Sequence, residues 1–136
     1  MFIDHDAGQP YTPQLSYFLG CFDIYDREET LGEELAKFDP NNQLDREALI
    51  LKYCLPRKRP HRQRFLLYKC LEEALKDDDY DFESLVIDDP EEYSSYPDGW
   101  EEMENVRGFF EDIYRLASEL WKDDLNKAGL EDQSTW

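Results

Sequence analysis

The sequence predicts a mainly α-helical fold, a single-domain bundle of four to six helices with an ordered acidic loop. Apolar residues recur three and four positions apart along several stretches, which is the spacing of one helix face. No stretch alternates apolar and polar residues over enough positions to predict a sheet. The 136 residues, 40% of them hydrophobic, suit one domain with one core. We therefore expect residues 1–136 to form a single domain.

The chain begins with an expected irregular N-terminal arm, residues 1–12, because Gly8 and nearby prolines disfavour regular structure. Thr12 is a suitable N-cap and Pro13 a suitable first helical residue, which predicts a helix over 13–25. Its apolar face consists of Leu15, Phe18, Leu19, Phe22 and Tyr25.

Two further helices are predicted before residue 56. Thr30 followed by Glu33 matches a capping box and predicts a short helix that ends before Pro40. Residues 43–55 have a wide apolar face, which is typical of a central helix, and Pro56 ends it.

A helix is expected to restart at Pro60, with a core face of Phe65, Tyr68, Leu71 and Leu75. Three aspartates at 77–79 would oppose the helix dipole, so the helix should end near Leu75 or Lys76. Residues 82–87 are equally compatible with a helical turn and a short strand.

The last part of the chain predicts a loop and the longest helix. Prolines and Gly99 favour an ordered surface loop over 88–99. Asp98 is a suitable N-cap for a helix over 100–127, which Gly129 ends. We expect residues 130–136 to be frayed.

Charge is distributed unevenly along the chain. There are 33 acidic and 15 basic residues, a formal net charge of −18. Residues 1–68 hold 11 acids and 9 bases, whereas residues 69–136 hold 22 acids and 6 bases. Such a surface repels nucleic acids and anionic lipids and attracts basic proteins, so we expect neither direct nucleic-acid binding nor a membrane partner.

The acidity is concentrated over Glu72–Glu104, where 15 of 33 residues are Asp or Glu and aromatic residues lie among them. Aromatic side chains often anchor protein interfaces, while carboxylates steer the encounter. We therefore predict a partner-binding surface between 77 and 102. Its residues are Asp77, Asp78, Asp79, Tyr80, Asp81, Asp88, Asp89, Glu91, Glu92, Tyr93, Tyr96, Asp98, Trp100 and Glu101.

Motifs for catalysis, metals and cofactors are missing from the sequence. Ser94 and Ser95 lack a nucleophile motif. Asp77, Asp79 and Asp81 resemble the start of a calcium loop, but Phe82 stands where that loop needs glycine. We expect no enzyme activity, no metal and no cofactor.

Two other features are interpreted structurally. The cysteines Cys21, Cys54 and Cys70 form no disulfide or zinc pattern, so we expect reduced core thiols. The one basic cluster, residues 57–64, is expected to pair with acids of its own domain. The N-terminus lacks a signal-peptide pattern and no apolar run approaches about 20 residues, which predicts a cytoplasmic protein.

In size, charge and its Asp/Glu/Tyr-rich segment 77–102, the chain resembles the small acidic immunity proteins with which bacteria neutralise toxins of the colicin and contact-dependent growth-inhibition types. The resemblance implies one-to-one binding to a basic toxin, and we expect a nuclease. It carries over no site residues.

Two alternatives remain open. A nucleic-acid mimic, similar to antirestriction or anti-CRISPR inhibitors, would display carboxylates in place of phosphates, although the basic cluster argues against this. A regulatory protein-interaction module is the other alternative.

Overall fold

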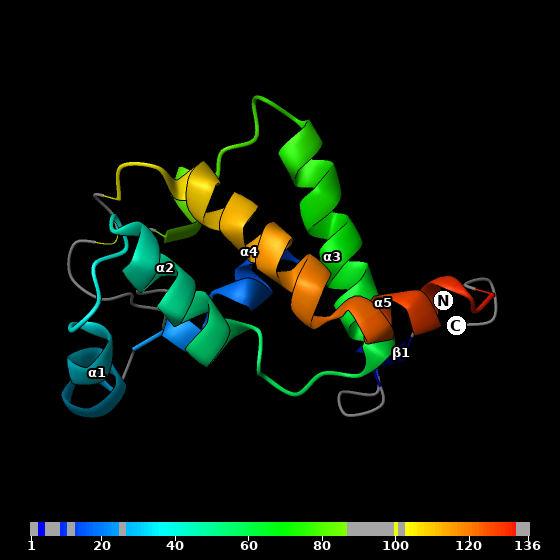
Figure 1. The fold of residues 1–136 in the computed structure, drawn as a ribbon, viewed down its shortest axis with the longest axis horizontal. Coiled ribbons are helices and arrows are strands. Elements are labelled where there is room, and N and C mark those ends of the chain that lie inside the picture. Colours follow the sequence, from blue (N-terminus) through cyan, green and yellow to red (C-terminus); the bar gives the residue numbers. More distant parts are fainter. Residues whose placement is uncertain are drawn as a thin grey trace.

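Residues 3–4, 9–10, 13–24, 27–86, 100 and 103–132 are described by the computed structural model. Within them the protein is mainly helical (Figure 1), which confirms the predicted fold class. The α-helices are α1 (Glu33–Leu35), α2 (Gln43–Leu49), α3 (His61–Lys76), α4 (Val106–Leu120) and α5 (Lys122–Gly129). The shorter elements are the strands β1 (Ile3–Asp4) and β2 (Gln9–Pro10), the 3₁₀ turns η1 (Leu15–Phe18), η2 (Gly20–Phe22) and η5 (Glu83–Val86), and the π-helical turns η3 (Glu28–Gly32) and η4 (Ile50–Cys54).

The N-terminal arm contains regular structure where irregular structure was predicted. β1 and β2 pair antiparallel, with Ile3 opposite Pro10 and Asp4 opposite Gln9. The arm is therefore in part a short ladder.

The predicted helix over 13–25 is wrong, because the chain forms the two 3₁₀ turns η1 and η2 instead. Gly20 in this stretch lowers α-helix propensity by about 1 kcal/mol relative to alanine. A 3₁₀ turn repeats every three residues. It therefore buries Leu15 and Phe18 on one side of η1, while Phe22 is buried from η2.

Residues 28–55 form the two predicted helices, but the first begins earlier than predicted. This short helix consists of η3 and then α1, and Thr30 is not its N-cap but donates to the Arg27 carbonyl. The predicted helix over 43–55 is confirmed as α2 continued by η4. The Asn42 side chain accepts from the Asp45 amide at 3.1 Å and caps its start.

The helix predicted from Pro60 is confirmed as α3, which ends at Lys76. The stretch after it, left open between helix and strand, forms the 3₁₀ turn η5.

The long helix predicted over 100–127 is wrong at its start and in its middle. It begins at Val106, where the Asn105 side chain accepts from the Gly108 amide at 2.9 Å. A Cβ at 108 would lie 2.3 Å from the Asn105 side-chain amide nitrogen, so a larger residue there would displace the capping side chain. At Trp121 the helix breaks into α4 and α5, and the buried indole donates to the Leu55 carbonyl at 3.2 Å.

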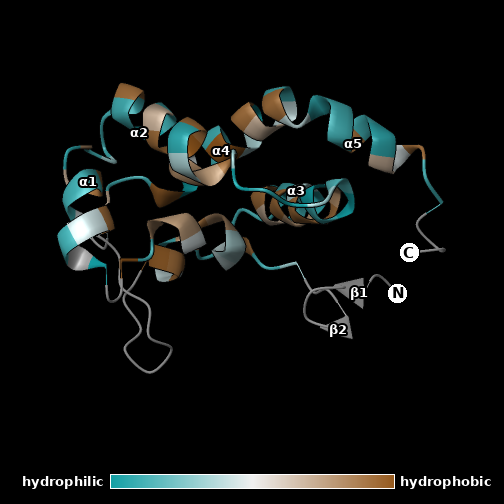
Figure 2. Ribbon diagram, turned by 90° about the horizontal axis from the view of Figure 1, so that it is seen from below, coloured by the Kyte–Doolittle hydropathy of each residue, from teal (hydrophilic) through white to brown (hydrophobic). Residues whose placement is uncertain are grey.

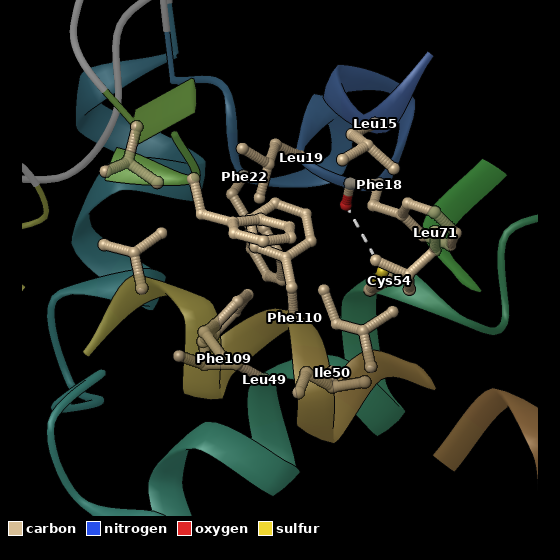
Figure 3. Close-up of a cluster of buried hydrophobic side chains, with 14 of the residues drawn as sticks. Leu15, Phe18, Leu19, Phe22, Leu49, Ile50, Cys54, Leu71, Phe109 and Phe110 are labelled. Atoms are coloured by element: carbon tan, nitrogen blue, oxygen red, sulfur yellow. Dashed lines mark hydrogen bonds between the residues drawn. The ribbon is translucent and has the colours of Figure 1, made fainter. Parts of the chain in front are cut away.

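A single large cluster of apolar side chains forms the main core (Figure 3). It is rich in aromatic rings: Phe22 lies 6.0 Å from Phe109 and Phe18 lies 6.1 Å from Trp121, centroid to centroid. In Figure 2, α2, α4 and α5 follow one another along one side of the molecule, and α3 lies below α4 and α5. None of the helices in the described residues has the length and apolar character needed to cross a membrane.

Candidate interaction surface

The chain leaves α3 in an exposed acidic segment, residues 77–83, which we call the acidic turn and which projects at the top of Figure 1. Asp77 ends the helix in an extended conformation. Its carboxylate accepts from the Asp79 amide at 3.0 Å, and its carbonyl accepts from the Tyr80 amide at 3.1 Å. Asp81 closes the segment by accepting from the Ser84 amide at 3.2 Å, at the start of η5. The sequence thus builds a locally hydrogen-bonded turn here.

Arg107, in the first turn of α4, holds the acidic turn against the core. Its guanidinium donates to the Leu75 carbonyl at 3.2 Å and to the Asp77 carbonyl. It also lies over the Phe82 ring, 4.8 Å from the centroid. Both carbonyls belong to the C-terminal end of α3, where helix carbonyls lack intrahelical donors. Arg107 therefore satisfies the Leu75 carbonyl and adds a second donor to the Asp77 carbonyl, which also accepts from the Tyr80 amide. Its contact with Phe82 holds the far end of the turn.

The carboxylates of the acidic turn have no basic partner among the described residues. They are Asp77, Asp78, Asp79, Asp81 and Glu83, and all five are exposed. The nearest base in sequence, Lys76, pairs with Glu72 and Glu73 instead. The negative end of the α3 dipole adds to their field. The turn is therefore a fixed point of concentrated negative potential.

The acidic turn contains one accessible aromatic ring, Tyr80, and one buried ring, Phe82. Tyr80 is 36% exposed and lies 4.7 Å from Phe82, which is fully buried. Burial is the first cause that raises the pKa of Tyr80, with the Cys70 and Asp81 charges adding to it.

Trp100 is not part of an accessible surface, contrary to its predicted role as a partner-binding residue. It is 1% exposed and packs 5.0 Å from Phe22 and 5.8 Å from Phe109. An aromatic residue among acids is typical of an interface anchor, but the Trp100 side chain packs into the hydrophobic core instead. The prediction for Trp100 is corrected accordingly.

The other predicted contact residues lie outside the described residues. They are Asp88, Asp89, Glu91, Glu92, Tyr93, Tyr96, Asp98 and Glu101. The described chain on either side is buried, at Val86 and at Trp100. Of the predicted surface, the structure brings together residues 77–81, to which it adds Glu83.

Arg107 was missed by the sequence predictions although it positions the acidic turn. A basic residue in the first turn of a helix opposes the helix dipole. Because the sequence predicts a helix that starts at residue 100, Arg107 falls in its third turn, and this signal appears only once the start at Val106 is known.

At the opposite end of α3, the basic cluster is paired as predicted for two of its members. Arg64 contacts Asp124 at 3.0 Å and Arg62 contacts Glu131 at 3.2 Å, both from the α5 region. Glu131 also bonds His61 at 2.8 Å. Hydrogen bonds from Arg62 and then His61 lower the pKa of Glu131. The prediction that 130–136 is frayed is therefore wrong at Glu131.

A shallow groove of about 310 Å³ lies between α3 and the α4–α5 region. Its lining residues are Phe65, Tyr68, Lys69, Ser118, Lys122, Leu125 and Asn126. The hydroxyls of Tyr68 and Ser118 bond each other at 2.8 Å, and Ser118 donates to the Tyr114 carbonyl.

Among the described residues, no three His, Cys, Asp or Glu side chains converge as metal ligands would. No family model, curated protein sequence or solved structure matches the chain.

Proposed function

We propose that this protein is a cytoplasmic immunity protein that neutralises a basic toxin, a nuclease, by binding it one to one through the acidic turn and the segment that follows. The observation that carries the proposal is the set of five exposed carboxylates, which form no ion pair within the described part of the chain, on a turn held by Arg107. An acidic side chain in the last turn of a helix costs about 0.3–1 kcal/mol of stability, and Asp77, the C-cap of α3, lies closest to that turn. The presence of the carboxylates there is accounted for by a partner that uses them.

A nuclease active site is a complementary partner because it holds a phosphate backbone with Lys and Arg. The carboxylates would steer the encounter, and Tyr80 would supply an adaptable aromatic contact at the edge of the turn. Covering the basic cleft would exclude the nucleic acid.

The test takes the partner that this protein captures by affinity purification from its native host, with the partner's nuclease activity and its association rate with this protein as readouts. The variant Asp78→Asn/Asp79→Asn removes two charges whose carboxylates make no hydrogen bond to any described residue, so the turn, whose carboxylate bonds come from Asp77 and Asp81, should keep its shape. The control Glu111→Gln/Glu119→Gln removes two exposed charges from α4. We expect the first pair to slow association about tenfold at low salt and to flatten its salt dependence, and the control to change it less than about twofold.

Equal association rates for the two variants would refute the role of the acidic turn. Inhibition of several unrelated DNA-binding enzymes would instead identify a nucleic-acid mimic. A melting temperature equal to that of the wild type would show, for each variant, that the fold is intact.

A further inference from the structure

The thiols of Cys21 and Cys54 share one hydrogen-bond acceptor. Cys54 Sγ donates to the Phe18 carbonyl oxygen at 3.2 Å (Figure 3), and Cys21 Sγ donates to the same oxygen at 3.4 Å. The two side chains also interact with each other, and this interaction is the first cause, ahead of burial, that raises the pKa of Cys54. Since Cys21 lies in η2 and Cys54 ends η4, the pair joins two elements far apart in sequence.

The two thiols differ in their access to solvent. Cys54 is 1% exposed, whereas Cys21 is only partly buried. A reagent from solvent therefore meets Cys21 first, and Cys54 is placed behind it to resolve the product. Thiol–disulfide exchange proceeds through this sequence of an accessible thiol and a neighbouring second thiol.

Two arginines of the basic cluster at 57–64 lie beside the segment that carries Cys21. A Cβ added at Gly20 would lie 3.1 Å from an Arg57 guanidinium nitrogen, and Arg59 donates to the Tyr17 carbonyl at 2.8 Å. The charges of Arg59 and Arg57 act to lower the pKa of Cys54, against the effects of Cys21 and burial. Guanidinium groups stabilise a thiolate and attract anionic reagents.

We propose that Cys21 and Cys54 form a dithiol site that an anionic low-molecular-weight disulfide, such as glutathione disulfide, oxidises to an intramolecular disulfide. The Cys21 thiolate attacks one sulfur of glutathione disulfide, which forms a mixed disulfide and releases one glutathione thiolate. Cys54 then gives its proton to the released glutathione thiolate, and its sulfur attacks Cys21 Sγ and releases the second glutathione as a thiolate. That thiolate takes up from solvent the proton that Cys21 lost before its attack. Two protein thiols are oxidised and one glutathione disulfide is reduced to two thiols. This site does not depend on the proposed immunity function.

The test treats the folded full chain with glutathione disulfide, quenches with acid, and measures intact mass and linked peptides. The expected product of the wild-type chain has lost two hydrogen atoms and contains a Cys21–Cys54 peptide. Cys54→Ser should stop at the mixed disulfide on Cys21, and Cys21→Ser should give neither product. Cys70, whose thiol lies 3.8 Å from the Pro13 carbonyl, is the matched control, and Cys70→Ser should react as the wild type does.

A linkage that involves Cys70, or a disulfide that forms only after unfolding in urea, would overturn the assignment. The wild-type peptide map needs no substitution, so the test stands even if a variant fails to fold.

A second measurement isolates the basic cluster. Arg57→Gln should slow mixed-disulfide formation at Cys21 by at least about threefold with glutathione disulfide, but not with the neutral hydroxyethyl disulfide. Lys127→Gln, which removes an exposed charge from α5, is the control and should slow neither reaction. Equal rates for Arg57→Gln and the control would overturn the role given to the guanidinium group.

Discussion

The two ends of α3 carry opposite charges, and the protein treats them differently. At the N-terminal end, Arg62 and Arg64 are partly buried and paired with Glu131 and Asp124. At the C-terminal end, the carboxylates of the acidic turn are exposed and have no basic partner among the described residues. Both sets of charges oppose the helix dipole, which favours acids at the start and bases at the end.

The two ends of α3 differ in how the unfavourable interaction with the helix dipole is offset. At the basic end, acids from another part of the chain neutralise the side chains themselves, so the charges serve the packing of α5 on α3. At the acidic end, Arg107 compensates only the backbone carbonyls of Leu75 and Asp77 and leaves the carboxylates free to act on solvent or a partner. The charges at the N-terminal end of α3 hold α5 in place, whereas those at the C-terminal end remain exposed to solvent.

The largest effect is expected where the basic end meets the core. Trp121 is buried, donates to the Leu55 carbonyl, and lies under the Arg64 guanidinium, 5.1 Å from ring centroid to carbon. Trp121→Ala should lower the free energy of unfolding by about 3–5 kcal/mol, as measured by urea denaturation.

The matched aromatic at the acidic end is Tyr80, which is partly exposed. Tyr80→Ala should cost about 1 kcal/mol or less. Similar losses for Trp121→Ala and Tyr80→Ala would contradict the contrast between a structural end and a surface end.

A smaller effect is expected at the clamp of the acidic turn. Arg107→Met keeps much of the apolar stem but removes the donors to the Leu75 and Asp77 carbonyls. We expect a loss of about 1–2 kcal/mol and faster amide hydrogen exchange in residues 77–83. The control is Arg115→Met on the same helix, whose exposed pairs with Glu47 and Asp112 should contribute less than about 1 kcal/mol. Unchanged exchange in the turn would show that Arg107 does not hold it.

Local sequence signals predicted much of α2, η4 and α3, because prolines and turn residues set their limits. Pro56 and Pro60 separate two helices, and the aspartates from Asp77 onward end the second. The failures have tertiary causes. Apolar residues three apart in 13–25 suit a 3₁₀ turn as well as an α-helix. At the break between α4 and α5, Trp121 donates to the Leu55 carbonyl, and no local pattern reveals a contact to a residue so far away in sequence.

For the candidate surface, the sequence predicted the acidic character but not which side chains are exposed. Composition located the acids of the turn, since charge is visible in a sequence. It could not tell which aromatic residues the core would take, and Trp100 and Phe82 are both buried. Arg107 was missed because its role depends on carbonyls of another helix.

The smallest effect is the pH dependence that Glu131 contributes at the basic end. Hydrogen bonds from Arg62 and then His61 lower the pKa of Glu131 from its ordinary value of 4.5. A carboxyl whose folded-state pKa is lowered contributes stability that is fully present above the unfolded pKa. That contribution is lost as pH falls from about 4.5 through the lower folded value, because the proton uncouples Glu131 from α3. Glu131→Gln should remove this part of the acid sensitivity, read from urea midpoints between pH 7 and 3. Glu73→Gln, an exposed carboxyl near the acidic end, is the control, and an equal change in both variants would contradict the assignment to the basic end.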